Sequence, residues 1–154
     1  MKSDSSIRNI CIAAIKRSSK AQHDFAFTKF FEKETFNEIA GDWLQSLNVQ
    51  ENELPISMVM IDRSNFTIVT TRRIIACNKG VINSIKPHDV VSWDWNDFKN
   101  YEKTSYTFGQ IVGEAEQVLQ FFIETGRASL VTIYAIMTLI KQQSKSPGPY
   151  SANQ

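Results

Sequence analysis

The chain has 154 residues, which is the size of one domain, and 42% of them are hydrophobic. This composition predicts a globular protein with a real core and excludes a disordered chain. The 17 Lys and Arg residues nearly balance the 16 Asp and Glu residues, so the net charge of +1 provides no overall attraction for nucleic acid. Because no apolar run is long enough to span a membrane and no secretion signal begins the chain, we expect a cytoplasmic protein.

The first fifty residues are predicted to be helical. Apolar residues between positions 7 and 15 recur at the three- and four-residue spacing of one helix face. A second apolar stripe runs through positions 36–47, and Thr35 with Glu38 has the form of a capping box at its start. A break separates this stripe from the phenylalanines that precede it, so we expect two or three N-terminal helices.

From position 54 onward, short β-favouring segments alternate with turn residues, which predicts antiparallel strands. The expected strands span 56–61, 66–71, 73–77, 81–85, 90–98, about 106–112 and 118–123. In the fifth of these, Trp93 and Trp95 alternate with polar residues and are expected on the buried face. Between 99 and 116, Gly109 and Gly113 interrupt both the strand and the helix pattern of apolar residues. The sequence therefore does not decide between a strand, a loop and a short helix there.

The last element is predicted to be a helix over 126–143 with Thr125 as its N-cap. Its apolar arc, widened by Ile136 and Leu139, exceeds what contact with one sheet requires. We expect the helix at 7–15 or the helix at 36–47 to cover the excess, with a second subunit as the alternative. If both helices are distant, Ile136 and Leu139 become the candidate partner-binding residues.

The segment FTIVTTRRIIACNKGVINSIKPHDVVSWDW contains a Thr-x-x-Arg turn after a strand, a Gly-containing hairpin and an Ile-x-x-x-Asp-Val-Val step. In these features it resembles the bacterial pleckstrin-homology-like (PH-like) domains of the GRAM-like type. The residues that carry the resemblance are Thr70, Arg73, Ile74, Ile75, Gly80, Ile85, Asp89, Val90 and Val91.

The resemblance implies an α+β fold in which an antiparallel PH-like sheet or barrel is closed by the C-terminal helix. The two or three N-terminal helices of residues 1–50 would pack on the PH-like core of residues 54–143. Together they would form a single domain over 1–145, followed by a flexible tail at 146–154. The resemblance also implies a binding role, although the turn at 62–65 has only one cation where lipid-binding members have a basic cluster.

No catalytic, metal or cofactor site is predicted. His88 and Asp89 share a turn with no Ser or Cys nucleophile nearby in sequence. The acidic residues Asp94, Asp97 and Glu102 match no metal-binding spacing and are expected on a solvated surface. Cys11 and Cys77 lie in separate apolar segments, which favours buried free thiols. We therefore expect a protein that is not an enzyme, and an enzyme whose site residues converge only in the fold is the weaker alternative.

The candidate ligand-binding residues are basic side chains around two successive turns: Arg72, Arg73, Lys79 and Lys86. They could bind a phosphorylated lipid headgroup or an acidic peptide, or serve only as solubilising charge. The first functional hypothesis is a non-enzymatic module that recognises a protein partner or a headgroup through hairpins or an exposed strand edge. The second is a small bacterial partner or immunity protein that binds and neutralises a toxin. A monomer or a homodimer fits either hypothesis.

Overall fold

Two antiparallel sheets and two long helices make up the protein, seen here in a computed structural model that describes residues 2–19, 25–39, 46–101 and 103–143. The larger sheet has the order β1 (Thr28–Phe30), β2 (Pro55–Asp62), β3 (Asn65–Thr70), β4 (Ile74–Asn78) and β5 (Val81–Ile85). The smaller sheet consists of β6 (Val90–Asp94), β7 (Tyr106–Gly113) and β8 (Val118–Glu124). The predicted α+β class is confirmed, and no strand of one sheet pairs with a strand of the other to close a barrel in the described part.

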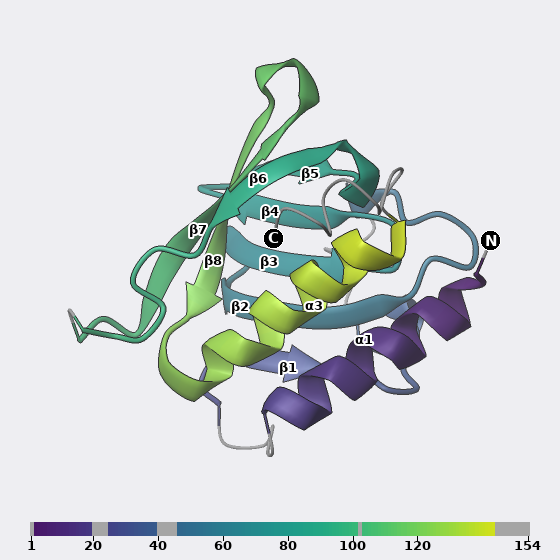
Figure 1. Cartoon of the computed structure of the whole chain (residues 1–154), viewed down its shortest axis with the longest axis horizontal. Helices are drawn as coiled ribbons and strands as arrows, with labels where there is room; N and C mark the ends of the chain where they lie inside the picture. Colours follow the sequence, from purple (N-terminus) through teal and green to yellow (C-terminus); the bar gives the residue numbers. More distant parts are fainter. Residues whose placement is uncertain (1, 20–24, 40–45, 102, 144–154) are drawn as a thin grey trace, which may run out of the picture.

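Helices α1 (Asp4–Ser18) and α3 (Ser129–Gln143) lie side by side on one face of the five-stranded sheet (Figure 1). Ser3 caps the start of α1, because its hydroxyl accepts a hydrogen bond from the amide of Ser6. Helix α3 follows a 3-10 turn at Gly126–Ala128. Thr125 occupies the predicted N-cap position, before the 3-10 turn, but its hydroxyl makes no capping bond and donates instead to the carbonyl of Thr104.

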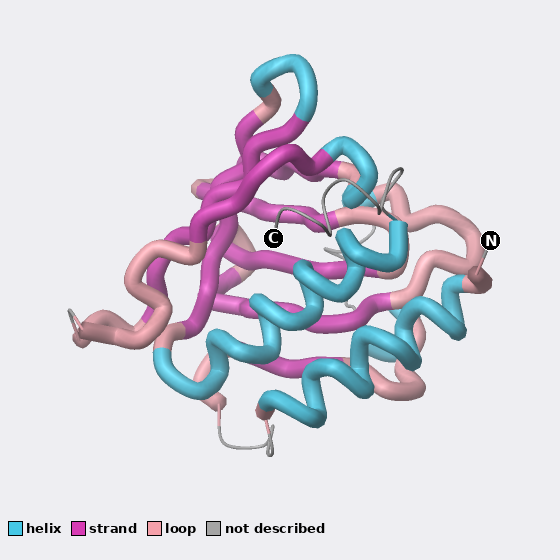
Figure 2. Tube along the Cα trace, in the orientation of Figure 1, coloured by secondary structure: helices cyan, strands magenta, loops and turns pink. Residues whose placement is uncertain are grey.

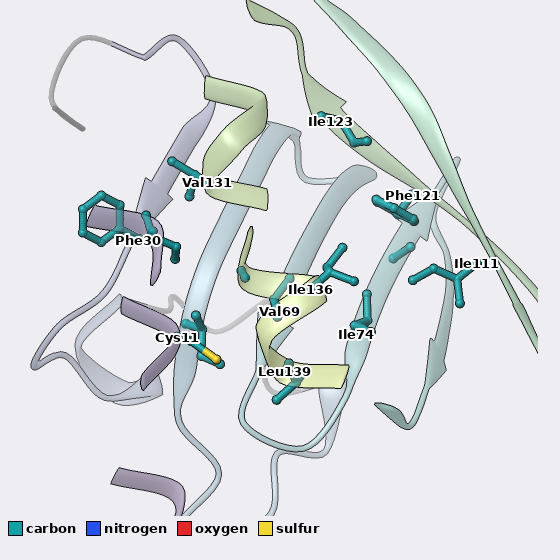
Figure 3. Close-up of a cluster of buried hydrophobic side chains, with 14 of the residues drawn as sticks. Cys11, Phe30, Val69, Ile74, Ile111, Phe121, Ile123, Val131, Ile136 and Leu139 are labelled. Carbon is teal, nitrogen blue, oxygen red and sulfur yellow. The ribbon is translucent and has the colours of Figure 1, made fainter. Parts of the chain in front are cut away.

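The main core lies between these helices, the large sheet and β8 (Figure 3). Ile15 of α1 and Ile136 and Leu139 of α3 are all fully buried in it. The prediction that the helix at 7–15 covers the wide apolar arc of the last helix is therefore confirmed. Ile136 and Leu139 have 0% exposure, so these two candidate partner-binding residues are not on the surface and serve the core instead.

A second core covers the opposite face of the large sheet. Its buried members are Phe36, Leu47, Phe66, Ile68, Ile75 and Cys77. Helix α2 (Phe36–Ile39) begins as predicted, with the Glu38 carboxylate accepting from the amide and hydroxyl of Thr35. Residues 40–45 of the expected second helix lie outside the described residues. Because Phe36 packs in this second core, α2 lies on the other side of the sheet from α3. The alternative prediction, that the helix at 36–47 covers the last helix, is therefore wrong.

The N-terminal region also contributes a strand, which the prediction of a purely helical segment missed. In β1, Thr28 and Phe30 are buried and Lys29 is exposed, the period-2 pattern of a strand rather than a helix. The buried carboxylate of Glu124 on β8 accepts hydrogen bonds from the amides of Ala26 and Phe27 and from the hydroxyl of Thr28. This carboxylate links residues 26–28 to the end of β8, so β1 is held against the smaller sheet as well as against β2.

For the stretch at 99–116 the sequence left strand, loop and short helix open; its described residues include β7 and then a 3-10 turn at Glu114–Glu116. Figure 2 shows this turn at the tip of the β7–β8 hairpin, which projects beyond the rest of the molecule. Gly109 is required in β7 because an added Cβ would lie 2.4 Å from the ring of Phe121.

Strand β6 ends at Asp94, four residues before the predicted end at 98. Trp93 and Trp95 pack against the main core as predicted, with Trp95 edge-on to Phe121 at 6.2 Å between ring centroids. No helix in the described ranges is both long and apolar enough to cross a membrane. The predicted tail at 146–154 lies outside those ranges.

Candidate protein-binding edge

Two of the predicted ligand-binding residues, Arg72 and Arg73, form ion pairs with carboxylates of the same chain. Arg72 donates to both carboxylate oxygens of Asp4, at 3.1 Å from Nε and 2.9 Å from Nη2, which holds the pKa of Asp4 below its ordinary value. Arg73 donates from Nε to the buried carboxylate of Glu53 at 3.0 Å and from Nη2 to the carbonyl of Leu47 at 2.7 Å. These contacts hold the start of α1 and residues 47–53 against the β3–β4 turn.

Lys79 and Lys86 lie at opposite ends of β5. The register pairs Asn78 with Val81 and Ile74 with Ile85, so Lys79 is in the β4–β5 turn and Lys86 follows β5 at the other end. A five-residue strand spans roughly 16 Å, which separates the two lysines. The four basic residues therefore do not form one rim. Lys79 and Lys86 are both exposed, and neither forms an ion pair with any described residue.

The turn before β5 sets which backbone groups of the strand face outward. Lys79 and Gly80 form a two-residue turn with φ of +52° and +82°, the left-handed values that such hairpins need. In this hairpin Asn78 and Val81 are a hydrogen-bonded pair, so the amides and carbonyls of Ile82 and Ser84 point away from β4. Consistent with this geometry, the carbonyl of Ser84 accepts a hydrogen bond from the side chain of Gln117 at 3.0 Å.

Beyond that contact the outer edge of β5 has no hydrogen-bonding partner among the described residues. Strand β5 is the last in its sheet, and no described residue bonds to the outward amide or carbonyl of Ile82. Val81 is 61% exposed and Ile82 is 38% exposed. The strand contains no proline and no charge, the features that usually protect an exposed edge. Chemically, the β5 edge offers backbone hydrogen bonds, apolar side chains on both faces and a cation at each end.

The other candidate residues that the structure describes lie in separate places. In the 3-10 turn Pro87–Asp89, Nε2 of His88 lies 3.3 Å from Oδ1 of Asp89. Asp94 is exposed at the end of β6, whereas Glu102 lies outside the described residues. Within the described ranges, no three His, Cys, Asp or Glu side chains come close enough together to hold a metal ion.

The sequence did not reveal the carboxylates that pair with Arg72 and Arg73. Asp4 lies 68 residues from Arg72, Glu53 lies 20 residues from Arg73, and no local pattern links either pair. Gln117, which covers one end of the β5 edge, is 33 residues from Ser84, and no sequence pattern links the two.

Comparisons of the chain with protein-family models, with characterised proteins and with solved structures gave no match.

Proposed function

We propose that the protein is a non-enzymatic binding module that recognises a protein partner by adding an extended segment of that partner to β5. The observation that carries this proposal is the β5 edge, with Val81 and Ile82 exposed between Lys79 and Lys86. Strand addition derives its affinity from main-chain hydrogen bonds and its specificity from side chains on alternate faces. The β5 edge supplies both.

The order of elements supports a PH-like scaffold for this module. Four antiparallel strands, β2–β5, are followed by three more, β6–β8, and then by the terminal helix α3. This is the order that the resemblance in the segment from Phe66 to Trp95 implies. Helix α1 and strand β1 are additions to that core.

A protein segment fits the β5 edge better than a phosphorylated headgroup does. A phosphate needs several cationic donors that converge on one point. Arg72 and Arg73 are committed to Asp4 and Glu53, and the two remaining lysines stand at opposite ends of β5. An extended segment with an acidic side chain near each end can reach both lysines, and its charge also favours association.

Charge also disfavours pairing of two copies through this edge. In an antiparallel pair of β5 strands, Lys79 of one copy would lie beside Lys86 of the other. Like charges on adjacent strands destabilise the pair. We therefore infer that the segment comes from a different protein. A toxin neutralised by this chain would be one such partner, and stoichiometric capture of one protein would identify that case.

Proline at position 82 tests the proposal. The amide of Ile82 faces outward, so Ile82→Pro removes a donor to the partner without removing a bond to β4. Ile82→Ala is the matched control because it keeps the amide. A partner captured by the wild-type chain, purified and re-bound, should lose at least about tenfold in affinity with Ile82→Pro and retain most of it with Ile82→Ala.

Amide hydrogen exchange supplies the second readout. Binding of the purified partner should slow exchange at Ile82 and Ser84. A partner that binds Ile82→Pro as tightly as the wild-type chain would overturn the proposal. The other outcome is that the chain binds phosphoinositide vesicles and loses this binding when Lys79 and Lys86 are changed to Ala. That result would establish a phosphorylated headgroup as the ligand.

A further inference from the structure

A groove opens between the two long helices, at a place separate from the β5 edge. It is lined by Ala14, Arg17 and Ser18 from α1 and by Tyr134, Met137, Thr138 and Lys141 from α3. The two helices lie in front of the large sheet in Figure 1, and α1 contacts β2, near the opposite edge of the sheet from β5. A ligand in this groove would therefore leave β5 uncovered.

The groove has an apolar floor and a small volume. Ala14 and Ser18 are small residues one turn apart on α1, and they leave space that larger side chains would fill. Met137 on α3 is 39% exposed, and its flexible thioether adapts to different apolar groups. The cavity measures about 210 Å³, below the roughly 300–1,000 Å³ of small-molecule sites. This size suits one or two side chains of a peptide better than a cofactor.

The rim of the groove is cationic on both sides. Arg17 and Lys141 are exposed, and neither forms an ion pair with any residue in the described ranges. Helix α3 contains no acidic residue. The acidic residue of α1 is Asp4, which is at the other end of that helix and bonded to Arg72. No carboxylate on either helix therefore competes for the two cations.

We propose that this groove is a second binding site, which takes an acidic peptide segment of a partner protein. One large apolar side chain of the segment sits over Ala14 and against Met137. Carboxylates on either side of it pair with Arg17 and Lys141. The charge complementarity selects an acidic segment, because a basic or neutral one would leave both cations without a counter-charge.

Random 15-residue peptides displayed on phage and selected on the full chain provide the probe. Selected peptides should carry Asp or Glu on both sides of Leu, Phe or Trp. The double variant Arg17→Glu with Lys141→Glu should weaken the synthesised peptides at least about tenfold, whereas Arg17→Lys with Lys141→Arg should retain most of the affinity. Arg17 and Lys141 are both exposed, so these variants should keep the wild-type stability within about 0.5 kcal/mol.

A variant at the other site separates this inference from the proposed function. Lys79→Glu with Lys86→Glu reverses both cations of the β5 edge and should leave the affinity for these peptides unchanged. The methyl resonance of Met137 should shift on peptide binding and serves as a local reporter. Failure to select any acidic peptide, or peptide binding that survives Arg17→Glu with Lys141→Glu, would overturn the inference and leave the β5 proposal standing.

Discussion

Arg73 and Glu53 form an ion pair in which the carboxylate is completely buried: Nε of Arg73 lies 3.0 Å from Oε2 of Glu53, whose side chain has 0% exposure. We expect Arg73→Ala to lower the free energy of unfolding by about 3 kcal/mol, because it leaves a buried charge without its partner. Urea denaturation followed by tryptophan fluorescence measures this loss.

Lys86→Ala is the control for that experiment. Lys86 is exposed and has no ion-pair partner among the described residues, so its removal should change stability by less than about 0.5 kcal/mol. A similarly small change with Arg73→Ala would contradict the structural role of Arg73 and return it to the ligand-binding candidates.

The pair Asp4–Arg72 should make stability depend on pH in the acid range. Hydrogen bonds from Arg72 lower the pKa of Asp4 in the folded state, so this contribution is complete above the ordinary Asp pKa of about 3.9 and is lost as pH falls below it. Asp4→Asn should cost about 1 kcal/mol at pH 7, a value reduced by the partial exposure of Arg72. Unfolding of both proteins between pH 7 and pH 2.5 should show this difference shrinking, and a constant difference would exclude the pair as its source.

Gly109 should tolerate no larger residue. The Cβ of Gly109→Ala would meet the buried ring of Phe121 at 2.4 Å, and overpacking of this kind costs about 1–3 kcal/mol. Gly80→Asn is the comparison, because Gly80 is in open space at φ +82° and Asn accepts left-handed backbone angles. Thermal unfolding should show a much lower midpoint for Gly109→Ala than for Gly80→Asn, and the reverse order would show that β8 does not pack on β7 as described.

Both thiols should be unreactive in the native protein. Cys11 and Cys77 are buried, and burial raises the pKa of Cys11 to about 12 and that of Cys77 above its ordinary value. A disulfide reagent such as DTNB should modify them only as fast as the protein opens. Ser92→Cys places a thiol on the exposed face of β6 and should react at once. Fast reaction of the wild-type chain would place a cysteine at the surface.

The strands and the two long helices could be predicted because their signals are local. Alternation such as that around Trp93, and the helical spacing of residues 7–15, are properties of a few consecutive side chains. The strand at Thr28–Phe30 was missed because three residues are too few to establish a period. The phenylalanines around it do not continue the helical stripe of positions 36–47, so a separate helix was expected there instead of a strand.

The site was harder to predict because pairing in space decides which charges are free. Lys79 and Lys86 were grouped with Arg72 and Arg73 because their turns are successive in sequence. In an antiparallel sheet successive turns lie at opposite ends of the strands, which separates Lys79 from Arg73. The engagement of Arg72 depends on Asp4, a residue in another element, and only the folded chain reveals it.

Helix α1 packs against α3, which is synthesised more than a hundred residues later, and the carboxylate of Glu124 receives the backbone of Ala26 and Phe27. Helix α1 also contacts β2, but its contact with α3 can form only after residues 129–143 have been synthesised. Ile15 of α1 and Ile136 of α3 share one core, so completing that core brings together residues more than a hundred positions apart. Contacts this distant in sequence slow folding, so we expect the packing of α1 against α3 to be a slow step in the folding of the domain.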